Sequence, residues 1–121
     1  MKVDFIADTN LLIYIHEGNE IIAPFLNYQF AISFITEVEL LGFEGISKSQ
    51  EKKLLALIDD CYNIDWNEKI KSKTIEIRRK HRIKLPDAII AATAIVNELP
   101  LVSADKGFTQ IDELDFILLD L

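Results

Sequence analysis

The sequence predicts an α/β fold with a mainly parallel sheet. Two observations indicate this class: short apolar runs alternate with longer segments of helical pattern, and no repeat, low-complexity tract or Pro/Gly-rich linker interrupts them. The chain of 121 residues, half of them apolar, is expected to form one domain over residues 1–121. A domain of this size buries about two-thirds of the surface that its unfolded chain exposes.

Each expected strand is a short apolar run that stops at a polar residue or a turn. The first covers residues 2–7 and stops before Asp8, and the second covers residues 30–34. The third covers residues 61–64, where Cys61 is expected to be a small buried side chain. The fourth and fifth cover residues 101–103 and 116–119. This gives a sheet of five strands.

The expected helices fill the gaps between these strands. Asp65 and Glu68 have the spacing of a capping box, which predicts a helix start at this point. Pro86 is expected at the first position of an almost wholly apolar helix, "LPDAIIAATAIV", which would be packed on most of its circumference. The expected helices are residues 11–16, 21–26, 37–43, 49–60, 66–82 and 86–98.

The charge is unevenly distributed along the chain. A net charge of −7 argues against a nucleic-acid partner. However, eight basic residues and one acid, Glu76, give residues 69–84 a charge of +7 and leave −14 on the rest. This segment is either a solvated helix face or a binding surface for RNA phosphates. In the second case the RNA-binding side chains would be Arg78, Arg79, Lys80, Arg82 and Lys84.

Nothing in the sequence indicates a membrane protein. The longest apolar runs are shorter than the roughly 18 residues of a membrane span. The amino-terminal residues also lack the basic segment that precedes the apolar core of a signal peptide. The single cysteine excludes an internal disulfide and a cysteine metal site, which fits a reducing compartment. We therefore expect a soluble, cytoplasmic protein without a membrane partner.

Four acids lie where a strand or loop meets a helix. Asp8 ends the first expected strand, and Glu39 follows the second. Asp87 begins the apolar helix, and Asp105 follows the fourth strand. Because ligands of open α/β sheets bind at the carboxyl ends of the strands, these acids are expected to meet in one cleft.

Each acid also has a purely structural interpretation. Asp8 could cap a helix, and Thr36 and Glu39 have the spacing of a capping box. Asp87 suits the positive end of a helix dipole, and Asp105 suits a turn. Both interpretations stay open for each acid taken alone.

The four acids together indicate a metal site. Carboxylates that converge in one cleft raise each other's pKa values unless a divalent cation neutralises them. Oxygen ligands without cysteine or clustered histidine favour Mg²⁺ or Mn²⁺, as one or two ions. Such an ion polarises a phosphoryl oxygen and supplies a hydroxide nucleophile, so the expected reaction is hydrolysis of a phosphodiester.

At these residues the sequence resembles the PIN-domain nucleases, in particular the VapC-type toxins of toxin–antitoxin modules. The matching segments follow in the expected order over nearly the whole chain: "FIADTNLLIYI", "AISFITEVELLGF", "LPDAIIAATAI" and "LPLVSADKGF". The resemblance implies an α/β/α sandwich and Mg²⁺- or Mn²⁺-dependent cleavage of RNA. The catalytic, metal-binding quartet would be Asp8, Glu39, Asp87 and Asp105.

The resemblance also implies supporting residues and partners. Asn10 and Ser103 would hydrogen-bond the carboxylates or a metal-bound water, and Thr9 would shape the first loop. A small antitoxin would insert a basic residue into the acidic cleft, and the chain would form a homodimer. The short apolar segments "IIAPFL" and "ELLGF" could form a patch for such a partner. Many relatives carry an acid where this chain has Gly107, which puts a second metal ion in doubt.

Three alternatives remain at this point. A PIN nuclease could process RNA without a toxin role, or the chain could be a catalytically weak binding module of PIN shape. A phosphate-switch module is the third. A receiver domain of that class needs paired acids after its first strand, and a haloacid-dehalogenase-type phosphatase needs an aspartate where this chain has Asn10.

Overall fold

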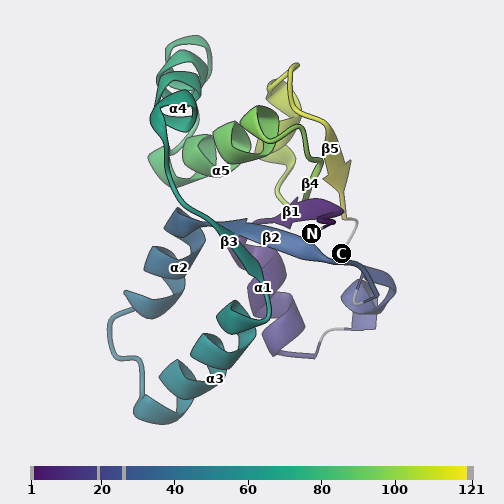
Figure 1. Ribbon diagram of the computed structural model, residues 1–121, viewed down its shortest axis with the longest axis vertical. Coiled ribbons are helices and arrows are strands. Elements are labelled where there is room, and N and C mark those ends of the chain that lie inside the picture. Colours follow the sequence, from purple (N-terminus) through teal and green to yellow (C-terminus); the bar gives the residue numbers. More distant parts are fainter. Residues whose placement is uncertain (1, 19, 26, 120–121) are drawn as a thin grey trace.

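A parallel sheet lies at the centre of the molecule, with helices on both faces (Figure 1). The structure is a computed structural model that describes residues 2–18, 20–25 and 27–119. Within these residues the sheet has five strands: β1 (Phe5–Ala7), β2 (Phe30–Ser33), β3 (Tyr62–Ile64), β4 (Leu101–Ser103) and β5 (Phe116–Leu118).

The strand order is β3-β2-β1-β4-β5, and every neighbouring pair is parallel. The central strand β1 pairs on one side with β2, where Ile6 lies opposite Ala31, and on the other with β4, where Ile6 lies opposite Leu101. All strands therefore end at the same edge of the sheet. The prediction of a mainly parallel five-stranded sheet is confirmed.

The helices form the outer layers of the predicted sandwich. Figure 1 shows α4 and α5 on one face of the sheet and α1 and α3 on the other. Their bounds are α1 (Thr9–His16), α2 (Phe34–Leu41), α3 (Lys48–Asp59), α4 (Glu68–Lys80) and α5 (Leu85–Val96). Two 3-10 helices, η1 (Glu20–Phe25) and η2 (Lys106–Gln110), complete the described elements. None of the helices in these ranges is both long and apolar enough to cross a membrane.

The strand pleat divides the core into two clusters. Ile6 packs with α4, α5 and η2, while its neighbours Phe5 and Ala7 point to the opposite face and pack with α1. Helix α5 lies between α4 and the sheet, and its small residues let it approach both closely. Its fully buried alanines are Ala88, Ala91, Ala92 and Ala94. The prediction of a helix packed on most of its circumference is confirmed.

Two predicted capping boxes do not form. Asn67, not Asp65, caps α4: its Oδ1 accepts from the Ile70 N–H at 2.9 Å, while Asp65 accepts from Trp66. Residues 65–67 instead carry the chain from the sheet edge to the helix. Helix α2 begins directly after β2, where Ser33 Oγ accepts from the Ile35 N–H. Thr36 therefore lies within the helix and cannot cap it.

Smaller differences concern element ends. Pro86 is the second residue of α5 rather than the first. The predicted helix at residues 21–26 is the 3-10 helix η1, and residue 26 lies outside the described residues. Cys61 lies just before β3, where it is half-buried and its thiol donates to the Leu57 carbonyl at 3.3 Å. Because β3 is an edge strand, Tyr62 is exposed.

Candidate metal centre

Asp8 lies directly after β1 and is almost completely buried, with 4% of its surface exposed. Its Oδ1 accepts from the Leu11 N–H at 2.8 Å, so it caps α1. Its Oδ2 accepts from Ser103 Oγ, at the end of β4, at 2.5 Å. These two hydrogen bonds fix the carboxylate between neighbouring strand ends. Asp8 is thus both a helix cap and a member of the acidic cleft.

Burial raises the pKa of Asp8 to about 6. The hydrogen bonds from Ser103 and Leu11 oppose this shift, whereas the negative charges of Asp87 and Asp105 add to it. Three of the four predicted acids therefore lie close enough to influence one another. A buried carboxylate in such surroundings is stabilised by any cation that reaches it.

Asp87 is the third residue of α5 and is half-buried. Burial raises its pKa, and the charges of Asp105 and Glu39 raise it further. Lys84 acts in the opposite direction and lowers it. Asp87 thus connects Glu39 electrostatically with Asp105 and completes the predicted group of four.

Glu39 lies in α2 and is exposed. Its Oε1 accepts from Thr9 Oγ1 at 2.7 Å, and the Thr9 hydroxyl also lies 3.2 Å from that of Thr36. Thr9, the first residue of α1, therefore holds Glu39 toward the cleft. The interpretation of Glu39 as the partner of Thr36 in a capping box is wrong, because both residues lie inside the helix.

Asp105 follows β4 and caps η2, where its Oδ1 accepts from the Gly107 N–H at 2.8 Å. Its own N–H donates to Ser103 Oγ at 2.9 Å, and Ser103 in turn donates to Asp8. Ser103 therefore joins the Asp8 carboxylate to the backbone of Asp105. A Cβ at Gly107 would lie only 3.1 Å from Asp105 Oδ1, so glycine allows this close turn.

A hollow of about 320 Å³ opens at this edge of the sheet and contains two of the acids. Asp87 and Asp105 lie in its wall, together with polar and basic side chains from the α4–α5 loop and η2. The other lining residues are Arg82, Ile83, Lys84, Gly107, Phe108 and Gln110. The hollow lies at the carboxyl ends of the strands, where the sequence predicts the site.

The PIN domain family matches residues 5–114, which include all four acids. The chain belongs to the PIN-domain family. No curated protein matches the sequence.

Solved structures agree with this assignment and confirm the predicted likeness to the VapC-type group. A chain of a toxin–antitoxin complex from Klebsiella pneumoniae is 29% identical, with a TM-score of 0.82; the match covers 97% of this chain and 98% of that one. The DNA-bound VapBC structure from Salmonella typhimurium has 23% identity and a TM-score of 0.85, covering 98% and 100% of the two chains. VapBC-1 from nontypeable Haemophilus influenzae has 23% identity and a TM-score of 0.79, covering 97% and 98%.

The donor chemistry of this PIN domain fits a hard divalent cation. The acids supply oxygen ligands only, and burial together with a smaller repulsion between the acids raises the pKa values of Asp8 and Asp87, both of which a bound cation would offset. Within the described ranges, no three acidic, histidine or cysteine side chains are already arranged around one point. Hydrogen bonds from Thr9 and from the Gly107 N–H hold one oxygen each of Glu39 and Asp105, and the second oxygen of each carboxylate accepts no hydrogen bond from the described residues.

The remaining predicted site residues are Asn10 and the five basic residues expected to bind RNA. Asn10 is exposed, and its amide forms no side-chain hydrogen bond with the residues that the structure covers, so its predicted role stays a prediction. Lys80 pairs with Glu76 at 3.3 Å, and Arg79 lines neither the acidic hollow nor the hollow next to it. Arg82 and Lys84 line the acidic hollow, and Arg78 lines the hollow next to it.

Sequence reasoning missed Gln110. Its Nε2 donates to the carbonyl oxygens of Gly107 at 2.9 Å and of Arg82 at 3.3 Å. Gln110 thereby ties the α4–α5 loop to the turn that carries Asp105. No local pattern could have revealed this role, because Arg82 is 28 residues away along the chain.

Proposed function

We propose that this PIN domain is an endoribonuclease that uses Mg²⁺ or Mn²⁺, as one or two ions, to hydrolyse RNA phosphodiester bonds. The observation that carries the proposal is the buried carboxylate of Asp8, held at the carboxyl end of β1 with a raised pKa beside Asp87 and Asp105. A bound ion would polarise the phosphoryl oxygen and activate water. The metal-binding side chains would be Asp8, Glu39, Asp87 and Asp105.

The surrounding residues orient these acids. Ser103 and the Leu11 N–H fix both oxygens of Asp8, so its position is set before an ion binds. From α1, Thr9 holds one oxygen of Glu39, Oε1. Asn10 would reach a metal-bound water from the same helix. Gly107 leaves Asp105 as the acid of this turn, which favours one tightly held ion.

The expected reaction can be tested with structured and single-stranded RNAs in Mn²⁺, Mg²⁺ or EDTA. Asp87→Asn should lose cleavage, whereas the matched control Asp112→Asn, an exposed aspartate beyond η2, should keep it. Both variants are first compared by thermal unfolding, so that a folding defect is not read as lost activity. Cleavage in EDTA, or equal cleavage by both variants, would contradict the proposed metal centre.

We propose further that the nuclease is the toxin of a toxin–antitoxin pair, acts in the cytoplasm and forms a homodimer. A second hollow, of about 310 Å³, lies between α1, α2 and α3 and reaches Glu39 at one end. Its wall includes Leu40 and Phe43 of the predicted patch "ELLGF", and 62% of Phe43 is exposed. The other predicted segment, residues 21–26, includes a residue outside the described ranges.

A small antitoxin protein would place apolar side chains in this second hollow and a basic side chain against Glu39. Such a partner would block the metal centre as it covers exposed apolar surface. The likeness to chains of toxin–antitoxin complexes supports this partner. Induced expression of the native chain in bacteria should arrest growth, and Asp87→Asn should not. Growth that continues while the native chain cleaves RNA in vitro would favour an RNA-processing role.

A further inference from the structure

A basic hollow of about 440 Å³ adjoins the acidic one. Arg82, Ile83 and Lys84 line both hollows, so the α4–α5 loop forms the ridge between them. The remaining lining residues of the basic hollow are Arg78 and His81. A polymer that enters the acidic hollow over this ridge would therefore pass the basic side chains first.

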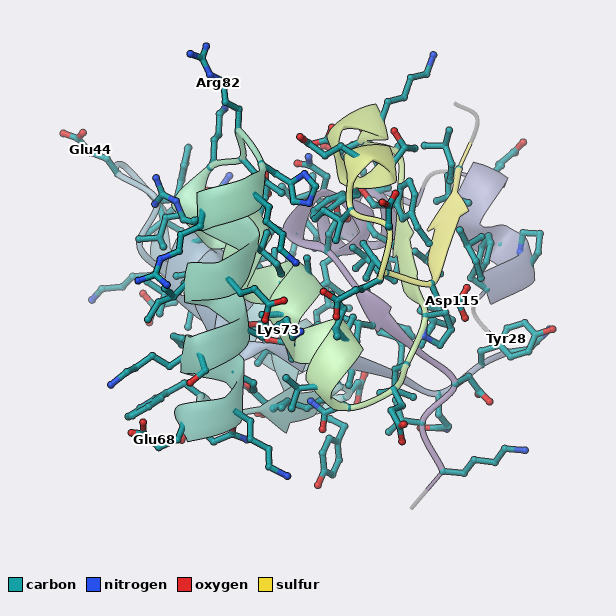
Figure 2. The ribbon with its side chains drawn as sticks, turned by 90° about the horizontal axis from the view of Figure 1, so that it is seen from above. Tyr28, Glu44, Glu68, Lys73, Arg82 and Asp115 are labelled. Atoms are coloured by element: carbon teal, nitrogen blue, oxygen red, sulfur yellow. The ribbon has the colours of Figure 1, made fainter. Side chains whose placement is uncertain are left out.

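The cations of this hollow are available for a ligand. Across residues 2–18, 20–25 and 27–119, no ion pair involves Arg78, Arg82 or Lys84, and all three are exposed. In Figure 2, Arg82 reaches outward from the end of α4, whereas Lys73 turns inward, where it pairs with Glu76 and Glu113. In a protein of net charge −7, three unpaired cations at one edge attract phosphates locally.

The ridge is held at a defined distance from the acids. Gln110 donates to the Arg82 carbonyl on one side and to the Gly107 carbonyl on the other. Lys84 precedes α5 and lies close enough to Asp87 to lower its pKa. The basic and acidic side chains are therefore parts of one surface rather than neighbours by chance in the sequence.

We propose that Arg78, Arg82 and Lys84 form a subsite for the RNA phosphates that flank the bond to be cut, with the strand crossing the α4–α5 loop. The inference rests on the proposed nuclease function and divides the basic segment: Arg79 and Lys80 lie outside the subsite. Among the described residues, no Phe, Tyr or Trp lines the basic hollow, so the subsite is expected to bind the RNA mainly through its phosphates.

The test is equilibrium binding of a labelled single-stranded RNA in EDTA, where metal-dependent cleavage cannot occur. The double variant Arg78→Gln/Arg82→Gln is compared with Arg79→Gln/Lys80→Gln, which removes the same charge from the same segment of the chain. Loss of two phosphate contacts should weaken binding about tenfold at physiological salt and reduce the slope of log affinity against log salt by about 1.4. The matched control should change neither. Thermal unfolding confirms that both variants are folded.

Two outcomes would overturn the subsite while leaving the nuclease intact. Equal weakening in both double variants would show a diffuse electrostatic attraction. Unchanged binding in Arg78→Gln/Arg82→Gln, with normal cleavage by the native chain in Mn²⁺, would place the strand elsewhere. If the native chain neither binds nor cleaves RNA, the proposed function itself fails, and the subsite fails with it.

Discussion

Replacing Asp8 with Asn removes a carboxylate whose pKa is about 6 in the folded chain and whose ordinary value is 3.8. This difference corresponds to about 3 kcal/mol of folding free energy. The folded state binds the proton more tightly than the unfolded state, so the metal-free native chain should lose stability as the pH rises from 3.8 to about 6. The stability is fully present below this range and lost above it. Burial, not a neighbouring charge, is the main cause.

Denaturant unfolding in EDTA, at several values from about pH 4 to about pH 8, measures this effect through the difference between native chain and Asp8→Asn. Asparagine keeps the shape and still accepts from the Leu11 N–H. The variant should gain up to about 3 kcal/mol relative to the native chain over this range. Any constant packing effect cancels, because only the change with pH is compared. Asp112→Asn serves as the exposed control.

Divalent metal should reverse the order of stability. Mg²⁺ or Mn²⁺ at neutral pH should stabilise the native chain and have less effect on Asp8→Asn, since ligand binding to the folded state alone raises stability. A difference between the two proteins that stays constant from low to high pH would refute the reasoning. So would a native chain that becomes more stable in EDTA as the pH rises through the same range relative to the variant.

Three further predictions concern other residues. Asn67→Ala should lower the unfolding free energy by about 1 kcal/mol and Asp65→Ala by much less, since Asn67 caps α4; equal losses in denaturant unfolding would contradict this cap. Ser103→Ala should raise the pKa of Asp8 further, because its hydrogen bond lowers that pKa, and should move the acidic limb of the pH–cleavage profile to higher pH. An unmoved limb would exclude this role. Burial raises the pKa of Cys61 to about 11, so alkylation at neutral pH should be slower in the folded chain than in denaturant, and equal rates would be the contrary result.

The elements that the sequence predicts best are those with a strong local pattern. The small apolar residues of α5 predict a buried helix, and the polar residues after the first apolar run predict the end of a strand, and the structure confirms both. The sequence predicts the start of α4 too early, because Asp65 and Asn67 are both suitable caps. Which of the two caps the helix depends on where β3 ends and on how the chain leaves the sheet edge, and in the folded chain Asn67 is the cap.

The site is predicted in part for a similar reason. Asp8 follows β1 directly and Asp105 lies two residues after β4, so their convergence follows from a parallel sheet. The links that hold the site cross long distances in the sequence: Ser103 reaches Asp8 over 95 residues, and Gln110 reaches Arg82 over 28. Such contacts depend on the packed fold and leave no periodic signal in the sequence.

The most direct test of the metal centre is anomalous diffraction from crystals of the native chain soaked in Mn²⁺. We expect a Mn²⁺ peak at the carboxyl ends of β1 and β4, contacted by the carboxylates of Asp8 and Asp87, and its loss in Asp87→Asn crystals. A saturating soak that leaves this cleft without a peak, or that places Mn²⁺ only on surface acids away from Asp8, would contradict the central claim.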